Sequence, residues 1–217
     1  MQKRKVPFAK RTQPYVSTGH LPPPEKVKAL VAEAYRRFRS NKEGKNSQVY
    51  PALAKVPAKM FGICVVGTTG NIYAAGDSEH EFTIMSVSKP FVFALVCEAI
   101  GYEAARHQLG VNSTGFPFNS LIAVELNDER TMNPLVNAGA IATTSLVPGN
   151  TADEKWEKIR DGLSRFAGRE LTLSKDVYES ESATNIRNQG IAHLLASYKR
   201  LYFDPDEATD IYTRQCS

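Results

Sequence analysis

Helical spacing of apolar residues dominates this sequence, and only one pair of short apolar runs predicts strands. The runs from Phe61 to Val66 and from Asn71 to Ala75 lie on either side of a turn at Gly67 to Gly70. Short apolar runs joined by a glycine-containing turn are typical of a β-hairpin. Elsewhere the patterns predict roughly five or six helices. We therefore expect at most two or three strands in the whole chain.

Each predicted helix carries an apolar stripe. Residues 26–40 should form an amphipathic helix, and a long apolar helix should run from Ser86 to a stop at Gly101. Residues 137–147, NAGAIATTSLV, carry many small side chains, which suit a helix packed tightly against its neighbours. Two later stripes consist of Trp156, Ile159, Leu163 and Phe166, ending near Gly168, and of Ile191, Leu194, Leu195, Tyr198 and Leu201. Stripes of this kind predict a helical core rather than a cofactor site.

The positive charge of the chain is concentrated at its start. The formal net charge is +4, but five lysines and arginines fall in the first eleven residues and no acid precedes Glu25. We therefore predict that residues 1–25 form a basic, proline-rich, solvated tail, with a targeting role as the alternative. The rest of the chain is close to neutral, which argues against a nucleic-acid partner.

The sequence also predicts a soluble, cytoplasmic protein. Thr12 to Pro24 has no continuous apolar core of the kind found in a secretory signal, and no window approaches the roughly 20 apolar residues that span a bilayer. Cys64, Cys97 and Cys216 are widely spaced, without a metal-binding pattern. These observations predict no membrane partner, no metal and a reducing compartment.

Ser86 and Lys89 open the long apolar helix and raise the first question of chemistry. Positions three apart share a helix face, so the hydroxyl and the amine could meet. Serine is a weak nucleophile until a base takes its proton, and lysine can be that base when burial keeps it neutral. The alternative is that both residues are only the polar start of a buried helix, and spacing alone leaves the choice open.

Three further motifs follow in order. They are Asn-Pro-Leu-Val-Asn-Ala-Gly-Ala-Ile at 133–141, Glu-Ser-Ala-Thr-Asn-Ile-Arg-Asn at 181–188 and Tyr-x-x-Gln-Cys-Ser at 212–217. Together with Ser-x-Ser-Lys at 86–89 they resemble the serine-dependent glutaminases, which share the fold of β-lactamases and penicillin-binding proteins. The resemblance covers roughly residues 26–217 and implies one α+β domain there, with a helical subdomain and an antiparallel sheet.

The resemblance also implies roles for individual residues. Ser86 matches the nucleophile, Lys89 matches its base, and Ser88 would only cap or support the helix. Four other positions match the glutamine-binding residues of the family: Asn137, Glu181, Asn188 and Tyr212. An acid among them suits the substrate ammonium, and neutral donors suit its carboxylate.

The implied reaction is hydrolysis of the side-chain amide of L-glutamine to L-glutamate and ammonia. It needs water and no cofactor, and the family resemblance implies a homo-oligomer, either a dimer or a tetramer.

Two departures from the family pattern are visible. The chain ends at Ser217, inside the pattern. The expected continuation would hold further strands, a second catalytic-site tyrosine and an oxyanion-hole amide, whose loss typically lowers the rate by about 10² to 10³. We therefore expect this chain alone to be a poor or inactive enzyme and only marginally folded. The second departure is QVYPALA at 48–54, where the family shows Tyr-Ile-Pro: Val49 occupies the tyrosine position, and Tyr50 could serve only after a one-residue shift.

Two other functions remain open. One is a β-lactam-recognising relative. Glu181, together with Asn188, argues against it, because an acid would repel the carboxylate of a β-lactam. The other is a truncated, inactive chain that binds partners or associates with full-length protomers. A shift in melting temperature with added glutamine would indicate a competent pocket.

Overall fold

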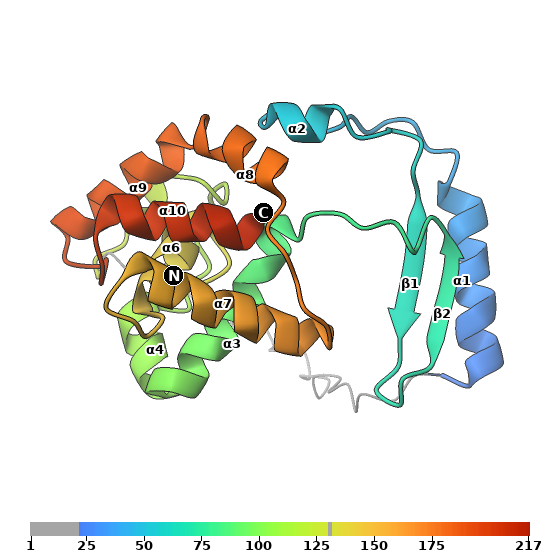
Figure 1. Ribbon diagram of the computed structural model, residues 1–217, viewed down its shortest axis with the longest axis horizontal. Helices are drawn as coiled ribbons and strands as arrows, with labels where there is room; N and C mark the ends of the chain where they lie inside the picture. The colour runs from blue at the N-terminus through green and yellow to red at the C-terminus, as the bar shows by residue number, and fades with distance from the viewer. Residues whose placement is uncertain (1–21, 130–131) are drawn as a thin grey trace, which may run out of the picture. The chain divides into compact units, whose positions relative to one another are not determined.

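The computed structural model of the chain describes residues 22–129 and 132–217 (Figure 1). Within these ranges it contains ten α-helices, one short 3₁₀ helix and two strands. Most of the predicted tail, residues 1–21, lies outside the described residues. The contacts divide the chain into two units, one comprising the chain up to Lys45 with Pro57–Glu81, and the other comprising Asn46–Val56 with Phe82–Ser217.

A hairpin and one helix form the first unit. Strands β1 (Gly62–Val66) and β2 (Ile72–Gly76) pair antiparallel, from Gly62 opposite Gly76 to Val66 opposite Ile72. The turn is closed by a 2.8 Å hydrogen bond from the Gly67 amide to the Asn71 carbonyl. The predicted hairpin is therefore confirmed. Among the described residues it supplies the only two strands, so the expected mixture of helices with a small antiparallel sheet is also confirmed.

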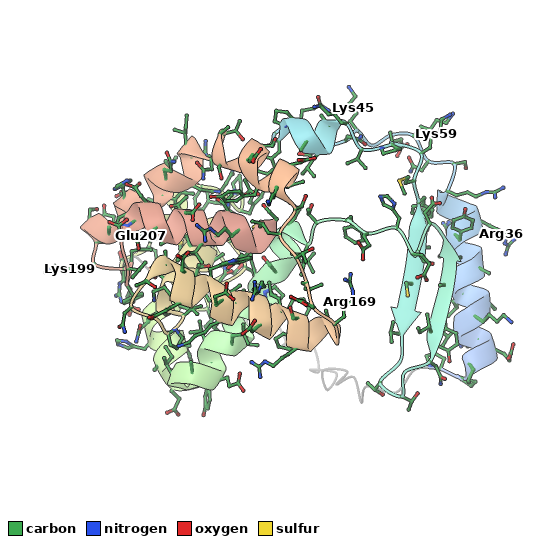
Figure 2. All side chains as sticks on the ribbon, viewed as in Figure 1. Arg36, Lys45, Lys59, Arg169, Lys199 and Glu207 are labelled. Carbon is green, nitrogen blue, oxygen red and sulfur yellow. The ribbon has the colours of Figure 1, made fainter. Side chains whose placement is uncertain are left out.

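Helix α1 (Pro24–Phe38) packs against both strands. Pro24 opens the helix, where a missing backbone donor is tolerated. Val27 and Val31 are buried, and the ring of Tyr35 stacks on that of Phe61 with centroids 5.7 Å apart. Arg36 points away from the strands (Figure 2). The amphipathic helix predicted at 26–40 therefore exists, shifted by two residues.

The second unit is helical. Its elements are α2 (Pro51–Ala54), the 3₁₀ helix η1 (Met85–Val87), α3 (Ser88–Ile100), α4 (Tyr102–Leu109), α5 (Ile122–Glu125), α6 (Asn137–Leu146), α7 (Ala152–Ala167), α8 (Lys175–Ser182), α9 (Ile186–Ser197) and α10 (Pro205–Cys216). None of the helices in the described part of the chain has the length and apolarity needed to cross a bilayer.

Helix α6 forms the centre of this unit and packs against α3, α9 and α10 (Figure 1). Every residue from Asn137 to Ser145 is buried. Small side chains make this possible because they allow neighbouring helices to approach on all sides. The tightly packed helix predicted at 137–147 is confirmed, and its position places any polar side chain it carries inside the core.

The two predicted stripes on α7 and α9 are largely confirmed as core. Ile159 and Leu163 are buried under α3, and Ile191 and Leu195 are buried against α6. Phe166 is an exception, since it is 53% exposed, although its ring packs against that of Phe91 with centroids 4.9 Å apart.

Candidate active site

Ser86 lies in the turn that leads into α3. The sequence predicted a helix from Ser86 onward, but the structure has the 3₁₀ helix η1 first and begins α3 at Ser88. Met85 has φ of 48°, a left-handed conformation that is unfavourable for a residue with a side chain. Such strain persists only where the surroundings hold it, and it is common at functional sites. The Ser86 side chain is exposed.

Lys89 points into the protein, with only 3% of its surface exposed. Its Nζ donates to Asn137 Oδ1 at 2.8 Å and to the Leu135 carbonyl at 3.3 Å. Burial lowers the pKa of the Lys89 ammonium, and the nearby Cys216 acts in the opposite direction. Within residues 22–129 and 132–217, no hydrogen bond joins Lys89 to Ser86. Bonds between catalytic groups are often long before substrate binds, so this geometry leaves the predicted pair open.

Asn137 connects three elements at the start of α6. Its Oδ1 accepts from Lys89 and, at 3.4 Å, from the hydroxyl of Tyr212 on α10. Its Nδ2 donates to Asn188 Oδ1 on α9 at 2.9 Å. All four side chains are buried. The structure therefore brings four of the six predicted site residues into one hydrogen-bonded group, from four different helices.

Glu181, at the end of α8, is the acid of the site. It is 1% exposed, and its Oε2 has no hydrogen-bond partner in the described structure. Burial raises the pKa of Glu181 to about 7, although a hydrogen bond from the Tyr50 hydroxyl lowers it. The carboxyl group also raises the pKa of the buried Tyr212 hydroxyl, after the larger effect of burial itself. A buried carboxylate oxygen without a donor favours binding of a cation or a hydrogen-bond donor.

Tyr50 lies against the predicted site residue Glu181, a contact that the sequence alone left open. It is half-buried beside Glu181, whereas Val49 is 66% exposed. Helix α2 is attached to α8 by a 3.1 Å hydrogen bond from the Ala52 amide to Ser180 Oγ, which brings Tyr50 to the acid. The sequence signal for this contact was the Tyr50-Pro51 pair, in which the tyrosine lies one position later than in the family pattern.

Residues 133–136, directly before α6, include Leu135, whose carbonyl is the second oxygen to which Lys89 donates. Asn133 Oδ1 accepts from the Leu135 amide at 3.0 Å, and Asn133 Nδ2 donates to the Asn112 carbonyl at 2.6 Å. This segment lies directly on Gly139, where a Cβ would be 1.8 Å from the Asn133 carbonyl oxygen. Only glycine fits at 139 without moving Leu135 and its carbonyl away from Lys89.

Comparison with known proteins identifies the family to which this arrangement belongs. The family model named Glutaminase matches residues 44–217. The chain belongs to the glutaminase family. Glutaminase 2 of Yersinia pestis is 64% identical over 203 residues, which are 94% of this chain and 60% of that protein. A glutaminase of Colwellia psychrerythraea is 47% identical over 191 residues, which are 88% of this chain and 61% of that protein.

Solved glutaminase structures resemble this chain over most of its length. A probable glutaminase superposes with a TM-score of 0.87 at 42% identity, covering 90% of this chain and 63% of the other. A Bacillus glutaminase superposes with a TM-score of 0.75 at 30% identity, covering 89% of this chain and 61% of the other. The chain thus spans about 60% of the length of the glutaminases that it matches in sequence.

No group of three or more His, Cys, Asp or Glu side chains that could hold a metal ion occurs in the part of the chain that the structure describes. Among the predicted site residues, Ser86 offers a hydroxyl, Lys89 a buried amine and Glu181 a buried acid.

Proposed function

We propose that this chain hydrolyses the side-chain amide of L-glutamine to L-glutamate and ammonia. The observation that carries the proposal is the buried group of Lys89, Asn137, Asn188 and Tyr212, with Glu181 holding an oxygen that lacks a donor. Free glutamine presents an ammonium, a carboxylate and a neutral carboxamide. Glu181 suits the first, and amide and hydroxyl groups suit the others.

In the proposed reaction Ser86 is the nucleophile and Lys89 is its base. Burial lowers the pKa of Lys89, so the neutral amine needed to accept the Ser86 proton becomes more accessible. The Ser86 Oγ forms a bond to the side-chain carbonyl carbon, and the carbon–nitrogen bond breaks. The leaving nitrogen takes the proton from Lys89 and departs as ammonia. Water then adds to the ester carbon, giving L-glutamate and restoring the serine.

Three finer predictions belong to this proposal. Residues 26–217 would form one domain of the serine β-lactamase-like fold, supported by a Ser-x-x-Lys sequence at the start of a helix packed on the buried α6. The protein would be cytoplasmic. It would also form a homo-oligomer, either a dimer or a tetramer.

The choice of substrate tests the proposal directly. Ammonia release should be measured with L-glutamine and with N-acetyl-L-glutamine, which has the same carboxamide but no ammonium. Loss of a charge-assisted contact to Glu181 should lower kcat/KM for the acetylated compound by about tenfold or more. Equal rates for the two compounds, or no ammonia from either, would contradict the proposal.

The pH dependence of binding follows from the pKa of Glu181. The substrate ammonium favours the ionised carboxylate, and the ionised fraction falls as the pH drops through about 7. The dissociation constant of L-glutamine should therefore rise by about tenfold between pH 7.5 and pH 6. Calorimetry on the Ser86→Ala variant would measure this without turnover. A Glu181→Gln variant should bind weakly at every pH, and an equally pH-independent affinity in the Ser86→Ala protein would refute the role of Glu181.

A further inference from the structure

A second set of buried polar side chains lies beside the proposed site. Gln215, near the end of α10, is 2% exposed. Its Oε1 accepts from Thr144 Oγ1 of α6 at 2.8 Å, and its Nε2 donates to Ser88 Oγ of α3 at 3.2 Å. Thr144 and Ser88 are themselves fully buried. One amide side chain therefore bridges three helices, and none of these three residues has a part in the proposed reaction.

The bridge reaches the turn that presents Ser86. Ser88 is the first residue of α3, and its amide donates to the carbonyls of Met85 and Ser86. The Ser86 side chain is exposed, and in the described part of the chain it forms no hydrogen bond that would fix the turn from outside. The left-handed Met85 must be held by neighbouring groups, and Ser88 is the buried polar group closest in sequence that can do so.

Cys216 adds a second contact to Ser88 from the same helix. Burial raises the pKa of its thiol to about 12, while hydrogen bonds with Ser88 and Tyr212 act in the opposite direction. The thiol therefore stays neutral, and it links Ser88 to the tyrosine of the site. The last turn of α10 thus contacts Ser88 through two consecutive residues.

We propose that Gln215 is a positioning residue, which holds the Ser86 turn against α6 and α10 through its hydrogen bond to Ser88. An amide suits this position because it accepts from Thr144 and donates to Ser88 at once. It also carries no charge into a core that already holds Lys89 and Glu181. The importance of the turn for catalysis rests on the proposed function, but the hydrogen-bonded link between Gln215 and Ser88 does not.

The link can be tested by hydrogen exchange on the full 217-residue chain. Gln215→Met keeps an unbranched side chain of similar size and removes both hydrogen bonds. Once Gln215 is replaced, the single hydroxyl proton of Thr144 can go to the Ala140 carbonyl, which lies 3.0 Å from its Oγ1, so this hydroxyl stays paired in the variant. Exchange of the Val87 and Ser88 amides should become about tenfold faster. Ser88→Ala removes the same link from the other end and should have the same effect. Gln108→Met, the same change at a half-buried glutamine of α4, should have none.

A double-mutant cycle separates a specific link from general loosening. If one hydrogen bond carries the effect, Ser88→Ala with Gln215→Met should exchange no faster at Val87 than either single variant. Additive effects, unchanged exchange at these amides, or equally faster exchange throughout α6 and α10 would each overturn the proposal.

The consequence for Ser86 is measured separately. The rate at which a fluorophosphonate labels Ser86 should fall about tenfold in Gln215→Met and not in Gln108→Met. A normal labelling rate in Gln215→Met would overturn the positioning role. If the unaltered chain is not labelled at all while exchange behaves as expected, the bridge stands and the serine chemistry of the proposed function fails.

Discussion

Replacing Ser86 by alanine is expected to lower ammonia release from L-glutamine by about 10⁴-fold or more, because removal of the nucleophile abolishes the acyl-enzyme route. The melting temperature should hardly change, since the Ser86 side chain is exposed and forms no hydrogen bond in the described structure. Steady-state kinetics and thermal unfolding of the same preparation would measure both effects.

The matched control is Ser40→Ala, an exposed serine just after α1. It should leave both ammonia release and melting temperature unchanged. A Ser86→Ala protein that releases ammonia as fast as this control would rule out Ser86 as the nucleophile.

Replacing Gly139 by alanine should have the largest effect on stability. The added methyl group would lie 1.8 Å from the Asn133 carbonyl oxygen, which is backbone and cannot rotate away. We expect a loss of about 3 kcal/mol, which corresponds to roughly 6 to 12 °C in melting temperature for a chain of this length. Because the displaced segment includes Leu135, the hydrogen bond from Lys89 to its carbonyl should weaken as well.

Gly190→Ala is the control for this change. Gly190 is also inside a helix, α9, but a Cβ there has no atom within 4 Å. Alanine should therefore raise stability by about 0.5 to 1 kcal/mol through its higher helix propensity. Chemical denaturation of both variants would show opposite signs, and a Gly139→Ala protein as stable as Gly190→Ala would contradict the close packing of the 133–136 segment on α6.

Local patterns predicted the elements that depend on local interactions. The hairpin followed from its glycine turn, and the helix at 137–147 followed from its small side chains. The resemblance also selected Lys89, Asn137, Asn188 and Tyr212, which the structure brings into hydrogen-bonded contact. These side chains come from four helices, so no pattern within one helix could have shown their contacts.

Other features depend on tertiary packing and were not predicted. Tyr50 reaches Glu181 only because α2 is attached to α8. Thr144 lies in α6, which is buried on every side, so apolar periodicity carries no information there. Gln215 is a polar residue on the buried face of α10, whose opposite face carries the exposed Asp206. The turn before α3 requires the strained Met85, whereas helix propensity favours a helix that starts at Ser86.

Lys155 illustrates the same limit in α7. A lysine in an amphipathic helix is normally solvated, but this one is 4% exposed. Its Nζ donates to the Ser145 carbonyl at 3.0 Å near the end of α6, and it lies 4.5 Å from the centre of the Phe203 ring. The Ser145 carbonyl, near the end of the buried helix α6, lacks a partner within its own helix, and bonding to it makes the burial of Lys155 favourable. The sequence does not show that the two groups meet, because they do so only when α6 and α7 are packed together.

The most direct measurement identifies the atom that attacks. A glutamine analogue with a diazomethyl ketone in place of the carboxamide should alkylate the nucleophile, losing nitrogen as the new carbon–oxygen bond forms. Peptide mapping by mass spectrometry should find the label on Ser86 and a labelling rate about 10² to 10⁴ lower in Lys89→Met, where the base is missing. A label on any other residue, or an undiminished rate in Lys89→Met, would contradict a serine and lysine mechanism at this site.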